Sequence, residues 1–150
     1  MSDYELSLVD TNVLVYSASP SAPQHEASRA LLDSEIKLCM TPQILAEFYA
    51  VVTNPRRVTV PFSASEARAF IEELISRVEI LPLMPAVVRR WTDLAERYGV
   101  TGARVFDLQL AASMIENGVK RIYTYNRADF EILADLEVLT PEELRPSPSV

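Results

Sequence analysis

Short runs of β-branched and other apolar residues alternate with longer segments of helical periodicity along this chain. This alternation favours a parallel sheet covered by helices, because parallel strands need a long crossover that usually contains a helix. The expected strands are Leu6–Asp10, Lys37–Thr41, Val78–Leu81, Arg121–Tyr125 and Leu136–Leu139. The expected helices are His25–Ser34, Pro42–Val52, Ser63–Arg77, Ala86–Tyr98 and Ala103–Glu116. The sequence therefore predicts an α/β fold with a sheet of four or five parallel strands.

Capping residues support several of these helix boundaries. Either Ser63 or Ser65 is placed to cap the third helix, and Glu66 completes a capping box with Ser63. Gly99 and Gly118 follow the last two helices, where glycine commonly ends a helix in the left-handed conformation.

The size and composition of the chain predict one globular domain. Its 150 residues are 49% hydrophobic, which is enough for a sizeable core. We expect this domain to span residues 1–145 and a flexible tail to follow at 146–150. No stretch approaches the roughly 18 apolar residues of a membrane span, and the N-terminus lacks the pattern of a secretory signal. The single Cys39 lies in an apolar run, which predicts a core position. We expect a cytoplasmic protein without membrane association.

The charge of the chain limits how it can meet nucleic acid. Twenty-one acidic residues against fourteen basic ones give a net charge of −7. A chain of this charge repels nucleic acid as a whole, because affinity for nucleic acid comes largely from neutralised phosphates. Any such contact must be local or assisted by a metal ion. Basic pairs such as Arg56–Arg57 and Arg89–Arg90 are either solvated surface or local phosphate contacts.

Three carboxylates occupy positions where the pattern points to the core. Asp10 ends the apolar run at residues 6–9 and shares a strand face with its leucines. Glu47 shares a helix face with apolar neighbours such as Val51, and Asp107 begins the apolar stripe of its own helix. A carboxylate removed from water costs several kcal/mol unless it is neutralised, hydrogen-bonded or bound to a cation.

A shared metal site would explain these positions together. Asp129 follows the fourth expected strand, so it should reach the same edge of the sheet as Asp10. Acids that meet in one cleft repel one another unless a divalent ion supplies the opposing charge. Only oxygen ligands are available in number, which favours Mg²⁺ or Mn²⁺ over zinc.

Each acid also has a simpler explanation when it is taken alone. Asp10 could cap the turn that follows its strand, and Asp107 could favour its helix through the helix dipole. Glu47 could meet an arginine, and Asp129 could belong to an ordinary turn. The combination of all four favours the shared site.

Four segments in this order resemble a PIN-domain ribonuclease of the kind found as the toxin of VapBC toxin–antitoxin pairs. The matching segments are LVDTNVLVYSA, PQILAEFYAVVTNP, TGARVFDLQLAA and IYTYNRADF. The resemblance implies a PIN-like three-layer α/β/α sandwich with a four- to five-stranded parallel sheet. It also implies an acidic, metal-dependent site that cuts single-stranded RNA. In addition, it implies that the protein forms a homodimer and binds a small antitoxin.

The resemblance also assigns roles to particular residues. Asp10, Glu47 and Asp107 match the three main acids of the family, and Asp129 matches its more variable fourth acid. The implied ligands of Mg²⁺ or Mn²⁺ are Asp10, Asp107 and Asp129. Because Asn126 stands where many relatives carry another acid, one-ion and two-ion sites both remain open. The implied polar residues around the site are Thr11, Asn12, Thr124 and Asn126. The basic residues expected to contact RNA are Arg56, Arg57, Arg104 and Arg127.

The mechanism expected from this acid set is metal-assisted hydrolysis of a phosphodiester bond. The ion would polarise the phosphate and acidify a bound water, while Glu47 would orient that water or take its proton. Attack on phosphorus would leave a 5′-phosphate and a 3′-hydroxyl.

Three other interpretations remain. The chain could be a catalytically weak PIN-fold binding protein, with the apolar stripe around Trp91 as either core or interface. It could be a housekeeping RNA-processing nuclease. An aspartyl-phosphate enzyme is weaker, because Asn12 stands where the phosphatases of that class carry a second aspartate. The chain has three glycines and no glycine-rich phosphate loop, which argues against a dinucleotide-binding fold.

Overall fold

The computed structural model describes residues 5–131, 133 and 135–144 of the chain. Five short strands form one sheet in the order β3-β2-β1-β4-β5, and all neighbouring pairs are parallel. The strands are β1 (Ser7–Val9), β2 (Leu38–Met40), β3 (Glu79–Ile80), β4 (Arg121–Tyr123) and β5 (Glu137–Leu139). The predicted parallel sheet is confirmed with five strands. The tail predicted at 146–150 lies outside the described residues.

In the described part of the chain, six α-helices connect and cover these strands. They are α1 (Thr11–Ser17), α2 (His25–Leu32), α3 (Pro42–Val52), α4 (Ala64–Arg77), α5 (Pro85–Tyr98) and α6 (Val105–Glu116). Three short 3₁₀ turns, η1 (Gly102–Arg104), η2 (Arg127–Asp129) and η3 (Pro141–Glu143), lie in the connections. Within the part of the chain that the structure describes, none of the helices has the length and apolar character needed to cross a membrane.

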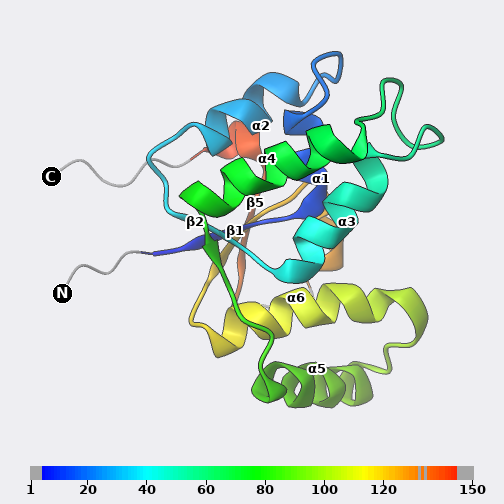
Figure 1. Cartoon of the computed structure of the whole chain (residues 1–150). Coiled ribbons are helices and arrows are strands. Elements are labelled where there is room, and N and C mark those ends of the chain that lie inside the picture. Colours follow the sequence, from blue (N-terminus) through cyan, green and yellow to red (C-terminus); the bar gives the residue numbers. More distant parts are fainter. Residues whose placement is uncertain (1–4, 132, 134, 145–150) are drawn as a thin grey trace, which may run out of the picture.

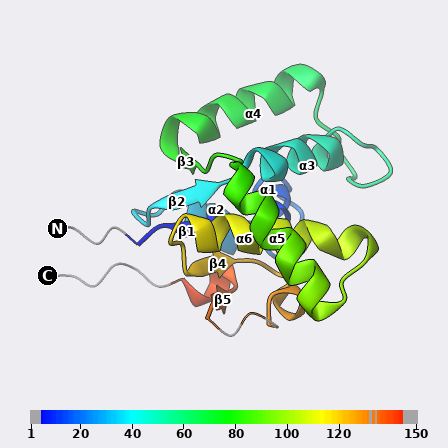
Figure 2. The ribbon, with the colours of Figure 1, turned by 90° about the horizontal axis from the view of Figure 1, so that it is seen from below.

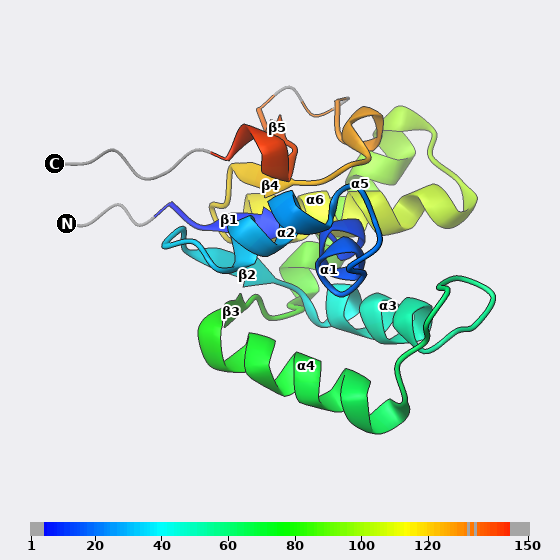
Figure 3. The same ribbon diagram turned by 90° about the horizontal axis from the view of Figure 1, so that it is seen from above.

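The helices form a layer on each side of the sheet. Helices α5 and α6 lie together on one face, as Figures 1 and 2 show. Helices α1 and α2 lie over the opposite face, and α3 and α4 lie beside them towards the β3 edge (Figure 3). The three-layer α/β/α arrangement expected from the sequence is therefore present. Because both faces are covered, every residue of β1 and β2 is buried.

Cys39 lies in the centre of this core, as predicted. Its side chain is fully buried on β2. Burial, with a smaller contribution from the charge of Glu79, raises the pKa of the Cys39 thiol to about 12. The thiol is therefore protonated and inaccessible in the folded protein.

Capping residues mark the start of α4 and the end of α5 where the sequence predicted. Ser63 rather than Ser65 caps α4: its Oγ accepts a hydrogen bond from Glu66 N at 3.1 Å, and its own N–H donates to Glu66 Oε1 at 3.0 Å. Gly99 follows α5 with a φ of 63°. Thr41, expected to end a strand, instead caps α3 by accepting a hydrogen bond from Ile44 N at 3.2 Å.

Several helix predictions differ from the structure: α2 ends at Leu32 rather than Ser34 and α5 begins at Pro85 rather than Ala86, and two differences concern the site. No helix was predicted at Thr11–Ser17, where α1 forms. That segment is short and contains β-branched valines, so it carries neither two turns of periodicity nor strong helix propensity. The helix predicted from Ala103 begins instead at Val105, because the preceding residues form the 3₁₀ turn η1.

The apolar stripe around Trp91 is divided between core and surface. Val87 and Leu94 are buried where α5 packs against α6 (Figure 2). Val88 and Tyr98, on the same helix, remain 42% and 46% exposed. Core packing therefore accounts for the first pair and not for the second.

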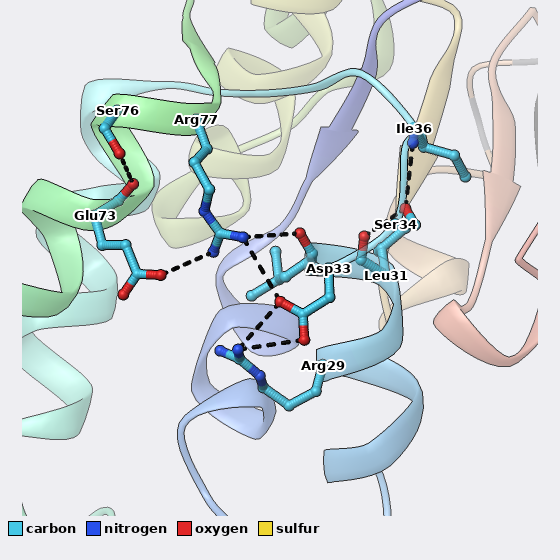
Figure 4. A network of polar contacts seen from close by, with 9 residues as sticks. Arg29, Leu31, Asp33, Ser34, Ile36, Glu73, Ser76 and Arg77 are labelled. Atoms are coloured by element: carbon cyan, nitrogen blue, oxygen red, sulfur yellow. Dashed lines mark hydrogen bonds and ion pairs between the residues drawn. The ribbon is translucent and has the colours of Figure 1, made fainter.

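A polar network on the surface joins α2 to α4 (Figure 4). Asp33 pairs with Arg29 at 3.1 Å and with Arg77 at 3.6 Å, and Arg77 also pairs with Glu73 at 3.6 Å. Because these side chains are partly exposed, each pair contributes at most about 1 kcal/mol to stability.

Candidate active site

A cavity of about 590 Å³ lies beyond the carboxyl ends of the central strands. Three carboxylates from distant parts of the chain line it: Asp10, Glu47 and Asp107. Asp10 directly follows β1, Glu47 lies in the middle of α3, and Asp107 lies in the first turn of α6. The parallel topology brings the end of β1, the middle of α3 and the first turn of α6 to one edge of the sheet.

Asp10 is buried and accepts hydrogen bonds from three donors. Its side chain is 7% exposed. Its Oδ1 accepts from Thr11 N at 2.8 Å, and its Oδ2 accepts from Thr124 Oγ1 at 2.8 Å and from Asn12 Nδ2 at 3.3 Å. Burial raises the pKa of Asp10 above its usual value, the hydrogen bonds from Thr124 and Thr11 oppose this, and the charge of Glu47 adds to it. Asp10 therefore caps α1, the simpler alternative, and also lines the cavity.

Asn12 and Thr124 join the ends of β1 and β4 around Asp10. Asn12 Nδ2 donates to Thr124 Oγ1 at 3.2 Å, and Asn12 Oδ1 accepts from the backbone N–H of Tyr125 at 3.0 Å. The backbone N–H of Asn126 donates to Thr124 Oγ1 at 3.0 Å. These contacts fix the position of the buried carboxylate relative to both strands.

Glu47 is held by two side-chain donors. Thr11 Oγ1 donates to Glu47 Oε2 at 3.1 Å, and Gln43 Nε2 donates to Glu47 Oε1 at 2.8 Å. Gln43 Oε1 is buried without a hydrogen-bond partner among the residues that the structure describes. Sequence reasoning did not single out Gln43, although its i, i+4 spacing to Glu47 on a helix is a signal for such a contact.

The pKa of Asp107 is raised well above its usual value of 3.8. Partial burial raises the pKa of Asp107 to about 6, and the negative charges of Asp129, Asp10 and Glu47 add to this effect. The positive charge of Arg104 opposes it. The four acids named from the sequence therefore interact electrostatically.

Asp129 and Asn126 lie differently with respect to the cavity. Asp129 ends η2, is exposed, and is not among the described residues that line the cavity. Its charge nevertheless raises the pKa of both Asp10 and Asp107. Asn126 does line the cavity.

One of the four predicted RNA-contacting arginines, Arg57, lines the cavity. Arg56 is exposed beside it, and its backbone N–H donates to Asn54 Oδ1 at 2.9 Å. Arg104 is exposed in η1. Arg127 is paired with Glu143 at 2.9 Å.

Two aromatic residues of the cavity lining were not predicted. Tyr16 lies on α1 with its ring edge-on to Tyr125, at a centroid distance of 5.2 Å. Phe106 precedes Asp107 and is 50% exposed. The sequence feature that could have indicated Phe106 is its position next to Asp107.

The atoms of the cavity that could bind a metal ion are oxygens. Carboxylate, amide and hydroxyl oxygens line it, which suits Mg²⁺ or Mn²⁺ better than zinc. His25 Nδ1 instead contacts Tyr16 O at 2.9 Å, and Cys39 is in the core. Among the described side chains, no three of His, Cys, Asp and Glu form a cluster able to hold a metal ion. The carboxylates thus face one cavity without forming a closed set of ligands.

The chain is similar to known proteins over most of its length. A model of the PIN domain family matches residues 7–136. Ribonuclease VapC43 of Mycobacterium tuberculosis is 33% identical over 116 residues, which cover 73% of this chain and 78% of that protein. Ribonuclease VapC24 of the same organism is 29% identical over 125 residues, covering 79% and 84% of the two chains.

Solved structures share the fold at lower identity. A chain of VapBC2 from Rickettsia felis, bound to a DNA fragment from its promoter, has a TM-score of 0.64 at 19% identity, covering 90% of this chain and 98% of that one. VapC20 of Mycobacterium tuberculosis, a toxin that cleaves the Sarcin-Ricin loop, has a TM-score of 0.65 at 17% identity, covering 89% and 98%. Together with the arrangement of β1, α3 and α6 around the cavity, these findings show that the chain belongs to the PIN domain family and is related within it to the VapC ribonucleases.

Proposed function

We propose that the protein is a metal-dependent endoribonuclease that cuts single-stranded RNA as the toxin of a toxin–antitoxin pair. One observation carries this proposal: Asp10, Glu47 and Asp107 face one cavity at the carboxyl edge of the sheet. The relatives VapC43 and VapC24 are ribonucleases by name, which supports the same activity.

The residues proposed to hold Mg²⁺ or Mn²⁺ are Asp10 and Asp107, with Asp129 approaching from the adjacent turn. Burial raises the pKa values of Asp10 and Asp107, and the negative charges of neighbouring acids add to the effect. A divalent cation bound here would offset the cost of charging both carboxylates. When bound, such an ion polarises a phosphate and lowers the pKa of a bound water.

Glu47 is the proposed general base. Both of its carboxylate oxygens accept hydrogen bonds, one from Thr11 and one from Gln43, so its side chain is oriented before substrate arrives. In the proposed reaction Glu47 orients the attacking water or takes its proton. Attack on phosphorus then leaves a 5′-phosphate on one product and a 3′-hydroxyl on the other.

Asp10 is positioned by its donors for the same reaction. Thr124, Asn12 and the backbone N–H of Thr11 fix the two oxygens of its carboxylate. Partners of this kind orient a ligand and tune its basicity.

The substrate contacts proposed are arginines beside the cavity. Arg57 is the strongest candidate because it lines the cavity, and Arg56 lies next to it in the chain. Arg104 and Arg127 are weaker candidates: the first is exposed before α6, and the second is already paired with Glu143. These local charges would offset the net charge of −7.

The proposed partners are a small antitoxin and a second copy of this chain. The VapBC complexes of Rickettsia felis and Haemophilus influenzae share the fold and support the antitoxin. Measuring the size of the purified chain alone tests the homodimer, and measuring it with the product of an adjacent short reading frame tests the antitoxin. We propose that both partners meet the protein in the cytoplasm.

Cleavage of a single-stranded RNA with and without EDTA tests the activity. We expect cleavage with Mg²⁺ or Mn²⁺, none in EDTA, and a loss in Asp10→Asn larger than the roughly 10- to 100-fold effect of an outer-shell partner. Asp33→Asn is the matched control, because Asp33 belongs to the surface network of Figure 4. Cleavage that persists in EDTA, or in Asp10→Asn, contradicts the proposal. A protein without metal-dependent cleavage would be a PIN-fold binding protein instead.

A further inference from the structure

Phe106 stands apart from the other phenylalanines of the chain. Phe48 and Phe62 both pack against Phe70, with ring centroids 5.0 and 6.1 Å apart, and Phe130 is 1% exposed. Phe106 is 50% exposed and has no ring partner among the residues that the structure describes. The packing of the core therefore does not account for this ring.

The position of Phe106 relates it to the proposed site of cleavage. It lies in the first turn of α6, directly before Asp107, and both side chains line the cavity. The buried residues of the helix, which begin with Leu108 and Leu110, face the core. The ring of Phe106 thus forms an apolar part of the wall of a cavity that also contains three carboxylates.

Arg57 completes a set of groups suited to a nucleotide. It comes from the loop after α3 and lines the same cavity as Phe106. A guanidinium binds phosphate, and an aromatic ring stacks on the face of a base. The acidic cavity repels the phosphates of a strand, whereas stacking on an uncharged ring involves no such repulsion. Binding of an RNA strand in this cavity therefore depends more on contacts to the bases than binding to a basic nuclease does.

We propose that Phe106 is the stacking platform for one unpaired nucleobase of the RNA substrate, next to the phosphodiester that is cut. This inference rests on the proposed ribonuclease activity. Bases in a duplex are covered on both faces by their neighbours, whereas an unpaired base has a free face for the ring. Phe106 then favours single-stranded over double-stranded RNA.

The test is a binding measurement with RNAs that lack one base. Labelled single-stranded RNAs, each with an abasic ribose at a different position, are titrated in Mg²⁺ with Glu47→Gln, which should be unable to cleave them. Removing the stacked base should weaken binding by about 5- to 150-fold, the size of one base–aromatic stack. When Phe106→Ala is added, the same abasic change should weaken RNA binding only slightly. Phe106→Trp should restore the full loss of affinity on removal of the base.

Tyr98→Ala is the matched control, because Tyr98 is similarly exposed, at 46%, and lies on α5. It should leave the sensitivity to the abasic position unchanged. An equal loss of affinity for intact and abasic RNA in Phe106→Ala overturns the proposal, as does a variant that binds RNA normally but fails to bind a partner protein. Because binding is measured without cleavage, an inactive wild-type protein overturns the proposed function and not this contact.

Discussion

The hydroxyl of Thr124 has every hydrogen-bonding position in use. Thr124 is fully buried, its Oγ1 donates to Asp10 Oδ2, and it accepts from Asn12 Nδ2 and Asn126 N. A hydroxyl offers one donor and two acceptor positions. The hydroxyl of Thr124 therefore positions the carboxylate of Asp10, the side-chain amide of Asn12 and the turn after β4.

Replacing Thr124 separates this role from simple packing. Thr124→Val keeps the shape and removes the hydroxyl, so Asp10 loses a donor and Asn12 loses an acceptor. We expect a loss of about 1–3 kcal/mol in the free energy of unfolding and roughly 10- to 100-fold in RNA cleavage. Thr124→Ser should retain most of both. Urea unfolding and initial cleavage rates give the two values, and a valine variant that cleaves like wild type would contradict the assigned role.

Helix α3 presents Gln43 and Glu47 to the cavity one turn apart. The helix begins with Thr41 as its cap and Pro42 in its first turn. The cap determines where the helix starts and so which face carries these two side chains.

Loss of this cap should destabilise the protein. Thr41→Ala removes the acceptor for Ile44 N, and we expect about 1 kcal/mol less stability. Thr41→Ser should restore it because the hydroxyl is retained. Thermal or urea unfolding distinguishes the two variants, and equal stabilities of the alanine and serine forms would rule out the capping contribution.

Some elements were predictable from the sequence because their signals are local. The capping box of Ser63 and the glycine after α5 mark helix ends within a few residues. Helix α1 was not predicted because its seven residues are few and its β-branched valines weaken the helix signal. Gln43 was not singled out because a polar residue four positions from a glutamate is also typical of a solvated helix face.

The order and the parallel direction of the strands decide which acids meet. The sequence predicted that the ends of parallel strands share an edge, and Asp10 lies at this edge, in a cavity that Glu47 of α3 and Asp107 of α6 also line. It does not determine how loops fold over that edge. For that reason Asp129 lies outside the described cavity lining while Arg57, from a long loop, lies within it.

The burial of Asp107, together with the negative charge of its neighbours, should make stability depend on pH and on divalent ions. The pKa of Asp107 is raised from 3.8 to about 6, so the folded protein binds this proton more tightly than the unfolded chain. The contribution of Asp107 to stability therefore falls as the pH rises from about 4 to about 6. Above this range the charged group is destabilising.

Mg²⁺ should offset this destabilisation only at pH values at which the carboxylate of Asp107 is charged. We expect the unfolding temperature to rise with Mg²⁺ more at pH 7.5 than at pH 5, because an ion that binds only the folded state stabilises it. Asp107→Asn should raise the unfolding temperature at pH 7.5 without the ion and reduce the response to Mg²⁺. Differential scanning fluorimetry measures both, and an equal Mg²⁺ shift at the two pH values would count against the site.

The lone thiol of the chain, buried at the middle of the sheet, has a practical consequence. Cys39 is fully enclosed and protonated in the native state, so a thiol-reactive dye reaches it only when the surrounding strands separate. Each labelled molecule then records one opening event. The protein carries its own probe for the kinetics of core exposure.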